Sequence, residues 1–177
     1  TDSADNVFVG QYTGNCVRGG CNTGMGKRAI WKMCSGSFNV AYGVCALHGS
    51  ATHSNNTGGC NVAMGKDAGK CVSSGADNIA LGRSAMSAGV VTGSYNVVFG
   101  KEAGLNATSA GCNIILGLKA GKSITAAGNN IFMGCYAGAN LDGASVSTNI
   151  MIGEHAGKGT AGCSGISNNI FIGRYTG

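Results

Sequence analysis

The sequence contains no proline and few charged residues, and each absence excludes a class of protein. Charged residues make up 11% of the 177 residues, whereas a globular enzyme carries about 25%. The 33 glycines without proline exclude collagen, which needs glycine at every third position together with proline or hydroxyproline. No apolar run approaches the roughly 18 residues of a membrane span, and no signal peptide is visible. The chain begins at Thr1 rather than Met, which favours a fragment of a longer chain.

Residues and motifs typical of catalysis are also scarce. Seven acidic residues and three histidines leave few candidates for general acid–base chemistry, and neither G-x-S-x-G nor H-E-x-x-H occurs. The segment GKDAGK at residues 65–70 superficially resembles a phosphate-binding loop. It lacks the Ser or Thr that should follow the lysine, and it lies in the ordinary register of a repeat described below. We therefore expect no enzyme activity and no cofactor.

Charge and metal-ligand patterns give equally little sign of a nucleic-acid or metal partner. The net charge is +5, but the basic residues are spread singly along the chain, so no nucleic-acid partner is expected. Cys45, His48, His53 and Cys60 surround the longest linker, yet their spacings do not match the paired-cysteine patterns of zinc sites, so no metal is expected. Long loops on rigid scaffolds often carry binding, which makes His48 and His53 candidates for a loop contact with an external surface.

The dominant feature is an internal repeat that begins Asn, apolar, any residue, apolar, Gly. Three residues after the glycine comes Ala or Thr, usually followed by a second glycine, as in NVFVGQYTG and NIFIGRYTG. Successive copies start 16 to 22 residues apart and cover the chain, so residues 1–177 are predicted to form a single repetitive domain. The ten copies start at Asn6, Asn22, Asn39, Asn61, Asn78, Asn96, Asn113, Asn130, Asn149 and Asn169.

Each repeat predicts one coil of an all-β parallel solenoid, or β-roll, of about ten short coils. The residues after Asn favour a short strand, whose first and third residues we expect to face the interior of the coil. Glycine then turns the chain, the Ala or Thr points inward, and a polar linker returns to the next Asn. One coil cannot bury its apolar face alone, so stacking is required, and nine steps of about 4.8 Å predict a rod about 43 Å long. The ten Asn residues are predicted to form a side-chain ladder along the stack.

The middle residue of each predicted strand indicates assembly with other chains. On this interpretation it faces away from the coil, yet it is never charged or polar. A strand that is apolar on both faces is covered on both faces. A parallel homotrimer would supply the second cover, although packing against the chain's own linkers is an alternative. The interface candidates are Phe8, Val98, Ile115, Phe132, Met151 and Phe171.

The nine cysteines are an odd number, which argues against complete pairing within the chain. Cys21, Cys60 and Cys112 occupy one column of the repeat, and Cys16 and Cys71 occupy another. The favoured interpretation is a niche for free thiols, which behave as small apolar groups. Disulfides between neighbouring linkers or between chains remain an alternative, with Cys16 and Cys21 as the intrachain pair.

Segments such as NNIFMGCYAG and the final SNNIFIGRYTG resemble the repeat arrays of bacteriophage tail-fibre proteins. More loosely, they are similar to the heads of trimeric autotransporter adhesins. Those heads are trimeric left-handed parallel β-rolls, so the resemblance implies a trimeric shaft. The repeats here are longer than adhesin coils, the linkers vary more, and the cysteine content is unusual for either group.

Three functional hypotheses follow. The first is a structural shaft of a phage or viral tail or surface fibre, homotrimeric, that positions a host-attachment tip. The second is a surface adhesin or binding module whose linker loops bind a host glycan or protein. The third is an extracellular filament subunit that stacks end to end. All three place the chain on a virion tail or fibre, or at an extracellular surface, without membrane insertion.

Overall fold

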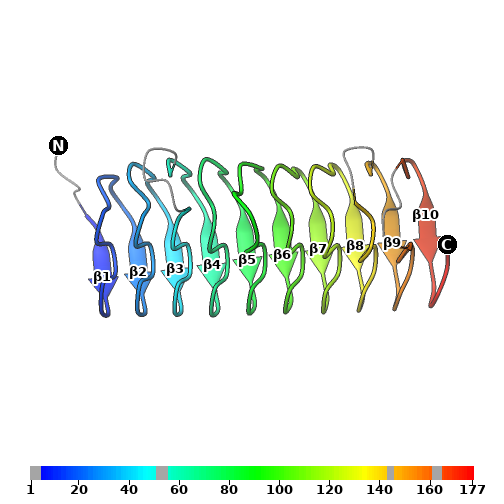
Figure 1. Ribbon diagram of the computed structural model, residues 1–177, viewed down its shortest axis with the longest axis horizontal. Coiled ribbons are helices and arrows are strands. Elements are labelled where there is room, and N and C mark those ends of the chain that lie inside the picture. The colour runs from blue at the N-terminus through cyan, green and yellow to red at the C-terminus, as the bar shows by residue number, and fades with distance from the viewer. Residues whose placement is uncertain (1–4, 51–55, 143–145, 161–164) are drawn as a thin grey trace.

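The computed structural model describes residues 5–50, 56–142, 146–160 and 165–177, which form a parallel β-solenoid of about nine turns (Figure 1). The all-β solenoid predicted from the repeat is confirmed. These ranges contain no helix, and therefore none that could cross a membrane. The strands are β1 (Val7–Val9), β2 (Thr23–Met25), β3 (Val40–Tyr42), β4 (Val62–Met64), β5 (Ile79–Leu81), β6 (Val97–Phe99), β7 (Ile114–Leu116), β8 (Ile131–Met133), β9 (Ile150–Ile152) and β10 (Ile170–Ile172).

The ten strands form one parallel sheet in chain order, and each begins directly after the Asn of its repeat. Equivalent repeat positions pair across neighbouring coils, so that Val97 lies beside Ile114 and Phe99 beside Leu116. Tight turns follow the strands along the lower edge of the rod in Figure 1, and the longer linkers return along the upper edge. Linkers can therefore vary in length without changing the register of the sheet.

The glycine that ends each strand is required for two physical reasons. Its φ angle lies between 124° and 138° in all ten coils, a region that L-residues with side chains rarely adopt. Its backbone also stacks closely on the next coil, because a Cβ at Gly82 would lie 2.7 Å from the carbonyl oxygen of Gly100. Any side chain here would both strain the turn and push two coils apart.

The direction of the strand side chains differs from the prediction. The middle residue of each strand points into the coil, and Val98, Ile115, Phe132 and Met151 have no exposed surface within the single chain. Phe8 and Phe171 are partly buried against the same core. The prediction that these six residues form an oligomer interface is therefore wrong. Strand side chains alternate, so a buried Asn forces the middle residue inward and the first and third residues outward.

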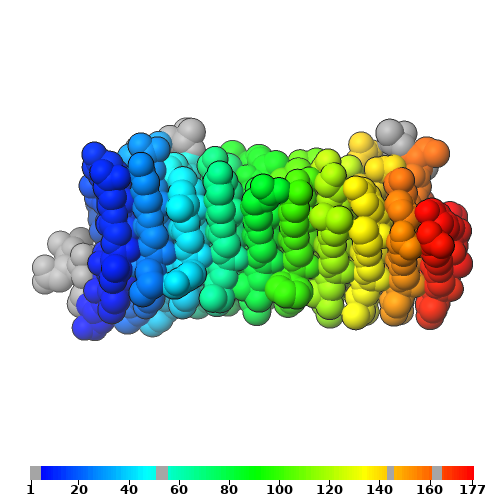
Figure 2. All heavy atoms as spheres, turned by 90° about the horizontal axis from the view of Figure 1, so that it is seen from below, coloured from blue at the N-terminus to red at the C-terminus, as the bar shows by residue number. Residues whose placement is uncertain are grey.

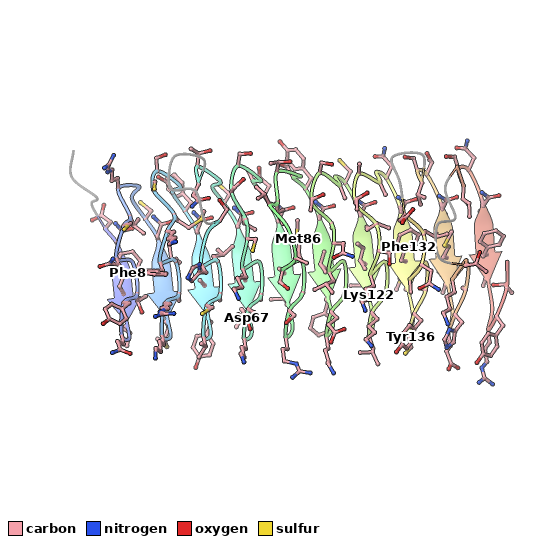
Figure 3. All side chains as sticks on the ribbon, viewed as in Figure 1. Phe8, Asp67, Met86, Lys122, Phe132 and Tyr136 are labelled. Atoms are coloured by element: carbon pink, nitrogen blue, oxygen red, sulfur yellow. The ribbon has the colours of Figure 1, made fainter. Side chains whose placement is uncertain are left out.

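Two columns of the repeat compensate for each other in size in every coil except coil 4, which has Ala63 and Gly69. One column is the middle strand residue, and the other lies six residues later in the turn. Where the strand supplies Gly24, Ala41 or Ala80, the turn supplies the buried side chain of Ile30, Leu47 or Met86 respectively. Where the strand supplies a large side chain, the turn residue is glycine, and a Cβ at Gly138 would lie 3.1 Å from the ring of Phe132. The large residues Met86 and Phe132 are labelled in Figure 3.

The ten Asn side chains form a continuous ladder through the stack, as the repeat led us to expect. At one rung, the backbone N–H and the Nδ2–H of Asn113 both donate to Oδ1 of Asn96, at 3.2 and 3.0 Å. Asn113 Nδ2 also donates to the carbonyl oxygen of Ala127, in the linker that leads to the next rung, at 2.9 Å. The rungs from Asn22 to Asn149 are at most 2% exposed. Full hydrogen bonding explains why a polar column is tolerated in the core.

Candidate functional surfaces

The first and third strand residues form a continuous apolar strip along the rod, which we call the apolar sheet face. Nineteen of its twenty residues are apolar or tyrosine, Thr23 being the exception, and none is fully buried. Fourteen of them expose between 36% and 67% of their surface. The face combines a column of Val and Ile with a column of larger side chains such as Phe99 and Leu116.

The size of this face distinguishes it from ordinary surface hydrophobicity. Twenty side chains with this exposure present on the order of 1,000 Å² of apolar surface, whereas a monomer's largest patch is about 300–600 Å². A stable protein–protein interface buries about 800 Å² on each partner. The apolar sheet face is therefore large enough for a stable contact along the whole rod.

The second surface is the tight-turn side of the rod, formed by the residues five to ten positions after each ladder Asn, and we call it the turn edge. Asp67 and Tyr136 on this edge are labelled in Figure 3. Figure 2, which views the rod from below, shows parallel ridges, one for each coil. The turn residue six positions after Asn has a positive φ in all ten coils, including 59° at Asp67 and 57° at Glu102. The inter-coil stacking must hold this left-handed geometry against a cost of about 1–2 kcal/mol for each non-glycine residue.

Nearly all of the positive charge gathers on the turn edge. It holds eleven of the twelve basic residues but only three of the seven acidic residues, so its formal charge is +8 and that of the rest of the chain is −3. The acids form ion pairs: Asp67 with Lys70 at 3.3 Å, Glu102 with Lys119 at 3.8 Å, and Glu154 with Arg174 at 2.8 Å. The basic residues of the turn edge are Lys27, Arg28, Lys32, Lys66, Lys70, Arg83, Lys101, Lys119, Lys122, Lys158 and Arg174.

Aromatic rings stack at the C-terminal part of the turn edge. The ring of His155 lies between those of Tyr136 and Tyr175, with centroid distances of 5.1 and 4.8 Å. The ammonium groups of Lys119 and Lys158 lie 5.5 and 5.6 Å from the centroid of Tyr136. Because the rings contact one another, both faces of His155 are occupied, and the stack orients nearby cations rather than offering a free platform.

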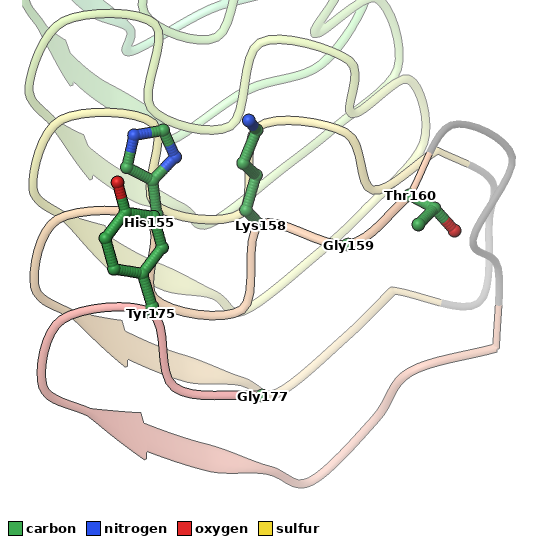
Figure 4. A pocket seen from close by; sticks show the side chains of 6 residues that line it. All are labelled: His155, Lys158, Gly159, Thr160, Tyr175 and Gly177. Carbon is green, nitrogen blue, oxygen red and sulfur yellow. The ribbon is translucent and has the colours of Figure 1, made fainter.

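A hollow of about 450 Å³ lies beside this stack, lined by His155, Lys158, Gly159, Thr160, Tyr175 and Gly177 (Figure 4). Lys158 and His155 are the basic side chains that line it, and none of its described lining residues is Asp or Glu. The hollow therefore offers cationic and aromatic contacts.

The predicted loop contact falls partly on the described residues. His48 is half-buried, and its ring packs edge-on against Trp31 with 4.8 Å between centroids. Burial is the main cause that lowers the pKa of His48, and the nearby Lys32 acts in the same direction. His48 thus contributes to packing in addition to lining a linker, while His53 lies outside the described residues.

The cysteines of the described part of the chain are free thiols. Cys21, Cys60 and Cys112 are exposed, whereas Cys16 and Cys71 are half-buried, and Cys16 is not bonded to Cys21. Burial raises the pKa of the Cys71 thiol, which disfavours its reactive thiolate form. Among residues 5–50, 56–142, 146–160 and 165–177, no group of three His, Cys, Asp or Glu side chains is arranged to hold a metal ion.

No protein-family model, curated protein or solved structure matches the chain. Its functional assignment therefore rests on the two surfaces. Sequence reasoning missed the turn edge, because the basic residues are dispersed along the chain and gather only when the coils stack. The sequence does contain a signal for it. When the ten repeats are aligned with one another, eleven of the twelve basic residues fall within one six-residue window, five to ten positions after the Asn.

Proposed function

We propose that the chain is a structural shaft that assembles with two further copies into a parallel homotrimer. The observation that carries the proposal is the apolar sheet face, which follows the whole length of the rod and would otherwise be exposed to water. A strip only three residues wide, about 10 Å, allows three copies to converge on one axis. Parallel chains would also match coil with coil.

The resemblance to bacteriophage tail fibres gives this shaft a biological setting. A stiff rod of constant cross-section separates whatever lies at its two ends, which is the task of a fibre that carries a host-attachment tip. Such a shaft belongs on a virion tail or fibre, or at an extracellular surface. The regular stack of backbone and Asn hydrogen bonds supports this role because it holds every coil at the same spacing.

The test is the solution mass measured by light scattering, with and without a reducing agent. The proposal expects a mass of three chains that reductant leaves unchanged. Replacing Phe99→Lys and Leu116→Lys places two charges on the apolar sheet face and should yield single chains. The matched control is Val44→Lys with Leu118→Lys, at a turn-edge position where Lys27, Lys66 and Lys101 already occur, and it should keep the wild-type mass.

Two results would overturn the trimer. A single-chain mass for the wild type would leave a lone solenoid, and an unbounded mass would favour the filament hypothesis. Circular dichroism of each variant separates loss of assembly from loss of folding.

A further inference from the structure

The turn edge carries a charge asymmetry that the shaft proposal does not use. Seven of its basic residues form no ion pair among the described residues: Lys27, Arg28, Lys32, Lys66, Arg83, Lys122 and Lys158. They are distributed over coils 2, 4, 5, 7 and 9, so the excess charge extends along the rod rather than forming one cluster. Like charges held in a row repel one another and attract an anion of matching shape.

We propose that the turn edge binds a linear acidic polysaccharide lying along the rod axis, through ion pairs with its carboxylate or sulfate groups. Neighbouring coils are about 4.8 Å apart, so the cations form an extended row instead of a pocket. Arginine and lysine both bind such oxyanions, and the Arg83 guanidinium can form bidentate contacts. This binding activity goes beyond the shaft role, because it does not require that the chain be a trimer.

The carboxylates of the turn edge favour a polysaccharide over a nucleic acid. Asp67, Glu102 and Glu154 lie among the cations, where their oxygens can accept hydrogen bonds from sugar hydroxyl groups. The sugar–phosphate backbone of DNA offers these oxygens no hydroxyl group, so they gain no such hydrogen bonds from it. Each carboxylate forms an ion pair with a neighbouring cation, as Glu154 does with Arg174 at 2.8 Å. The cation balances the negative charge of the carboxylate locally.

The charge density and the aromatic rings support the same choice. A net +8 spread over a rod of about 43 Å is one charge in roughly 5 Å, whereas duplex DNA carries one in about 1.7 Å. Single-stranded nucleic acids are bound by free aromatic faces. Here both faces of His155 are covered by Tyr136 and Tyr175. The exposed Tyr12 and Tyr175 lie at opposite ends of the rod, so they do not form a row of free faces.

The experiment measures binding of the full chain to immobilised heparin and to polygalacturonate as a function of salt, with neutral dextran, single-stranded DNA and duplex DNA as further probes. The test variant is Lys66→Gln, Arg83→Gln and Lys101→Gln. The control changes net charge equally but off the turn edge, by Arg18→Gln, Asn129→Asp and Asn168→Asp. These three positions are exposed, and Asp77 already occupies the same repeat column as Asn129 and Asn168.

We expect the wild type and the control to bind both acidic polysaccharides and not dextran. The test variant should bind at least tenfold more weakly at about 50 mM salt, and its slope of log affinity against log salt should be smaller by about 2–3, since each neutralised charge releases about one counterion. Equal weakening in both variants, no binding by the wild type, or tighter binding to either DNA would overturn the inference.

The two proposals fail separately. A three-chain mass without polysaccharide binding overturns only the polysaccharide site. A single-chain mass with binding retained overturns the shaft assembly and leaves the site.

Discussion

Two groups of coils fill the same cross-section in opposite ways. In coils 2, 3 and 5 the strand contributes a small residue and the turn fills the core, as Ala41 and Leu47 do in coil 3. In coils 6 to 9 the strand fills the core and the turn residue is glycine, as with Phe132 and Gly138. Each of these seven coils therefore places one large side chain in the core, supplied either by the strand or by the turn.

The two solutions differ in backbone strain. Ile30, Leu47 and Met86 have φ angles of 49°, 44° and 50°, a left-handed conformation that costs about 1–2 kcal/mol for a residue with a side chain. The glycines of coils 6 to 9 adopt the same conformation without that cost. Filling the core from the strand is thus the less strained solution.

The largest expected effect comes from emptying a strand-filled coil. Phe132→Ala should lower the free energy of unfolding by about 3–5 kcal/mol, because Gly138 supplies no side chain to close the cavity. Urea unfolding followed by circular dichroism measures the change. Val44→Ala on the exposed turn edge is the control and should stay within about 0.5 kcal/mol. A similar loss in both variants would refute the strand-filled description.

The second prediction converts one solution into the other. Adding Gly138→Leu to Phe132→Ala copies the arrangement of Ala41 and Leu47. The free energy of unfolding of the double variant should be about 1–2 kcal/mol higher than the sum of the two single changes predicts. Phe132→Ala combined with Gly104→Leu, two coils away, is the matched control and should be additive. Additive behaviour in both pairs would show that the columns do not compensate.

The third prediction isolates backbone strain in the turn-filled coils. Ile30→Gly should be more stable than Ile30→Ala by about 1 kcal/mol, because the position is left-handed. Ile124 is equally buried but does not have a positive φ, so the order should reverse there. Thermal unfolding of the four variants tests this, and the same order at both positions would contradict it.

The smallest expected effect concerns the pH dependence of stability in one turn-filled coil, coil 3, which contains His48. The pKa of His48 is lowered from 6.5 by burial, so below pH 6.5 the unfolded chain takes up a proton more readily than the folded chain. Stability should be constant above about pH 6.5 and should decrease as the pH falls below it, until the folded His48 is also protonated. Melting temperatures at pH 7.5 and 5.5 should differ less in His48→Gln than in the wild type. An unchanged difference would exclude His48 as the cause.

The repeat predicted the position of every strand, the turn glycines and the Asn ladder, because each requires a particular residue type at a fixed spacing. The prediction of which strand side chains point into the coil is wrong, because a column of Val and Ile is typical of a buried position, and here that column is on the outer face. The buried set instead comprises Asn, the middle residue and the Ala of the turn, several of them small or polar. The sequence does contain a signal for the inward columns. Coil 5 has a small residue at the middle strand position and a large one in the turn (Ala80 and Met86), whereas coil 6 has a larger residue in the strand and glycine in the turn (Val98 and Gly104). Two positions that exchange size in this way share the same interior space.

The gathering of charge on the turn edge was harder to predict, since it depends on which segment of each repeat lies at the same side of the rod. Lys66 and Arg83 are 17 residues apart in sequence but occupy adjacent coils. The network of stacked rings around His155 depends further on side-chain conformations, which the repeat pattern alone does not determine.

The Asn ladder also gives the rod an electrical direction. Each rung from Asn6 to Asn149 accepts from the coil that follows it, as Asn96 does from Asn113 and Asn113 does from Asn130, so the side-chain carbonyl dipoles are aligned along one axis. Aligned hydrogen bonds polarise one another, and each becomes a better acceptor through its neighbours. Replacing one rung would therefore weaken the polarisation of the coils on both sides, and the damage would extend beyond the bonds that were removed.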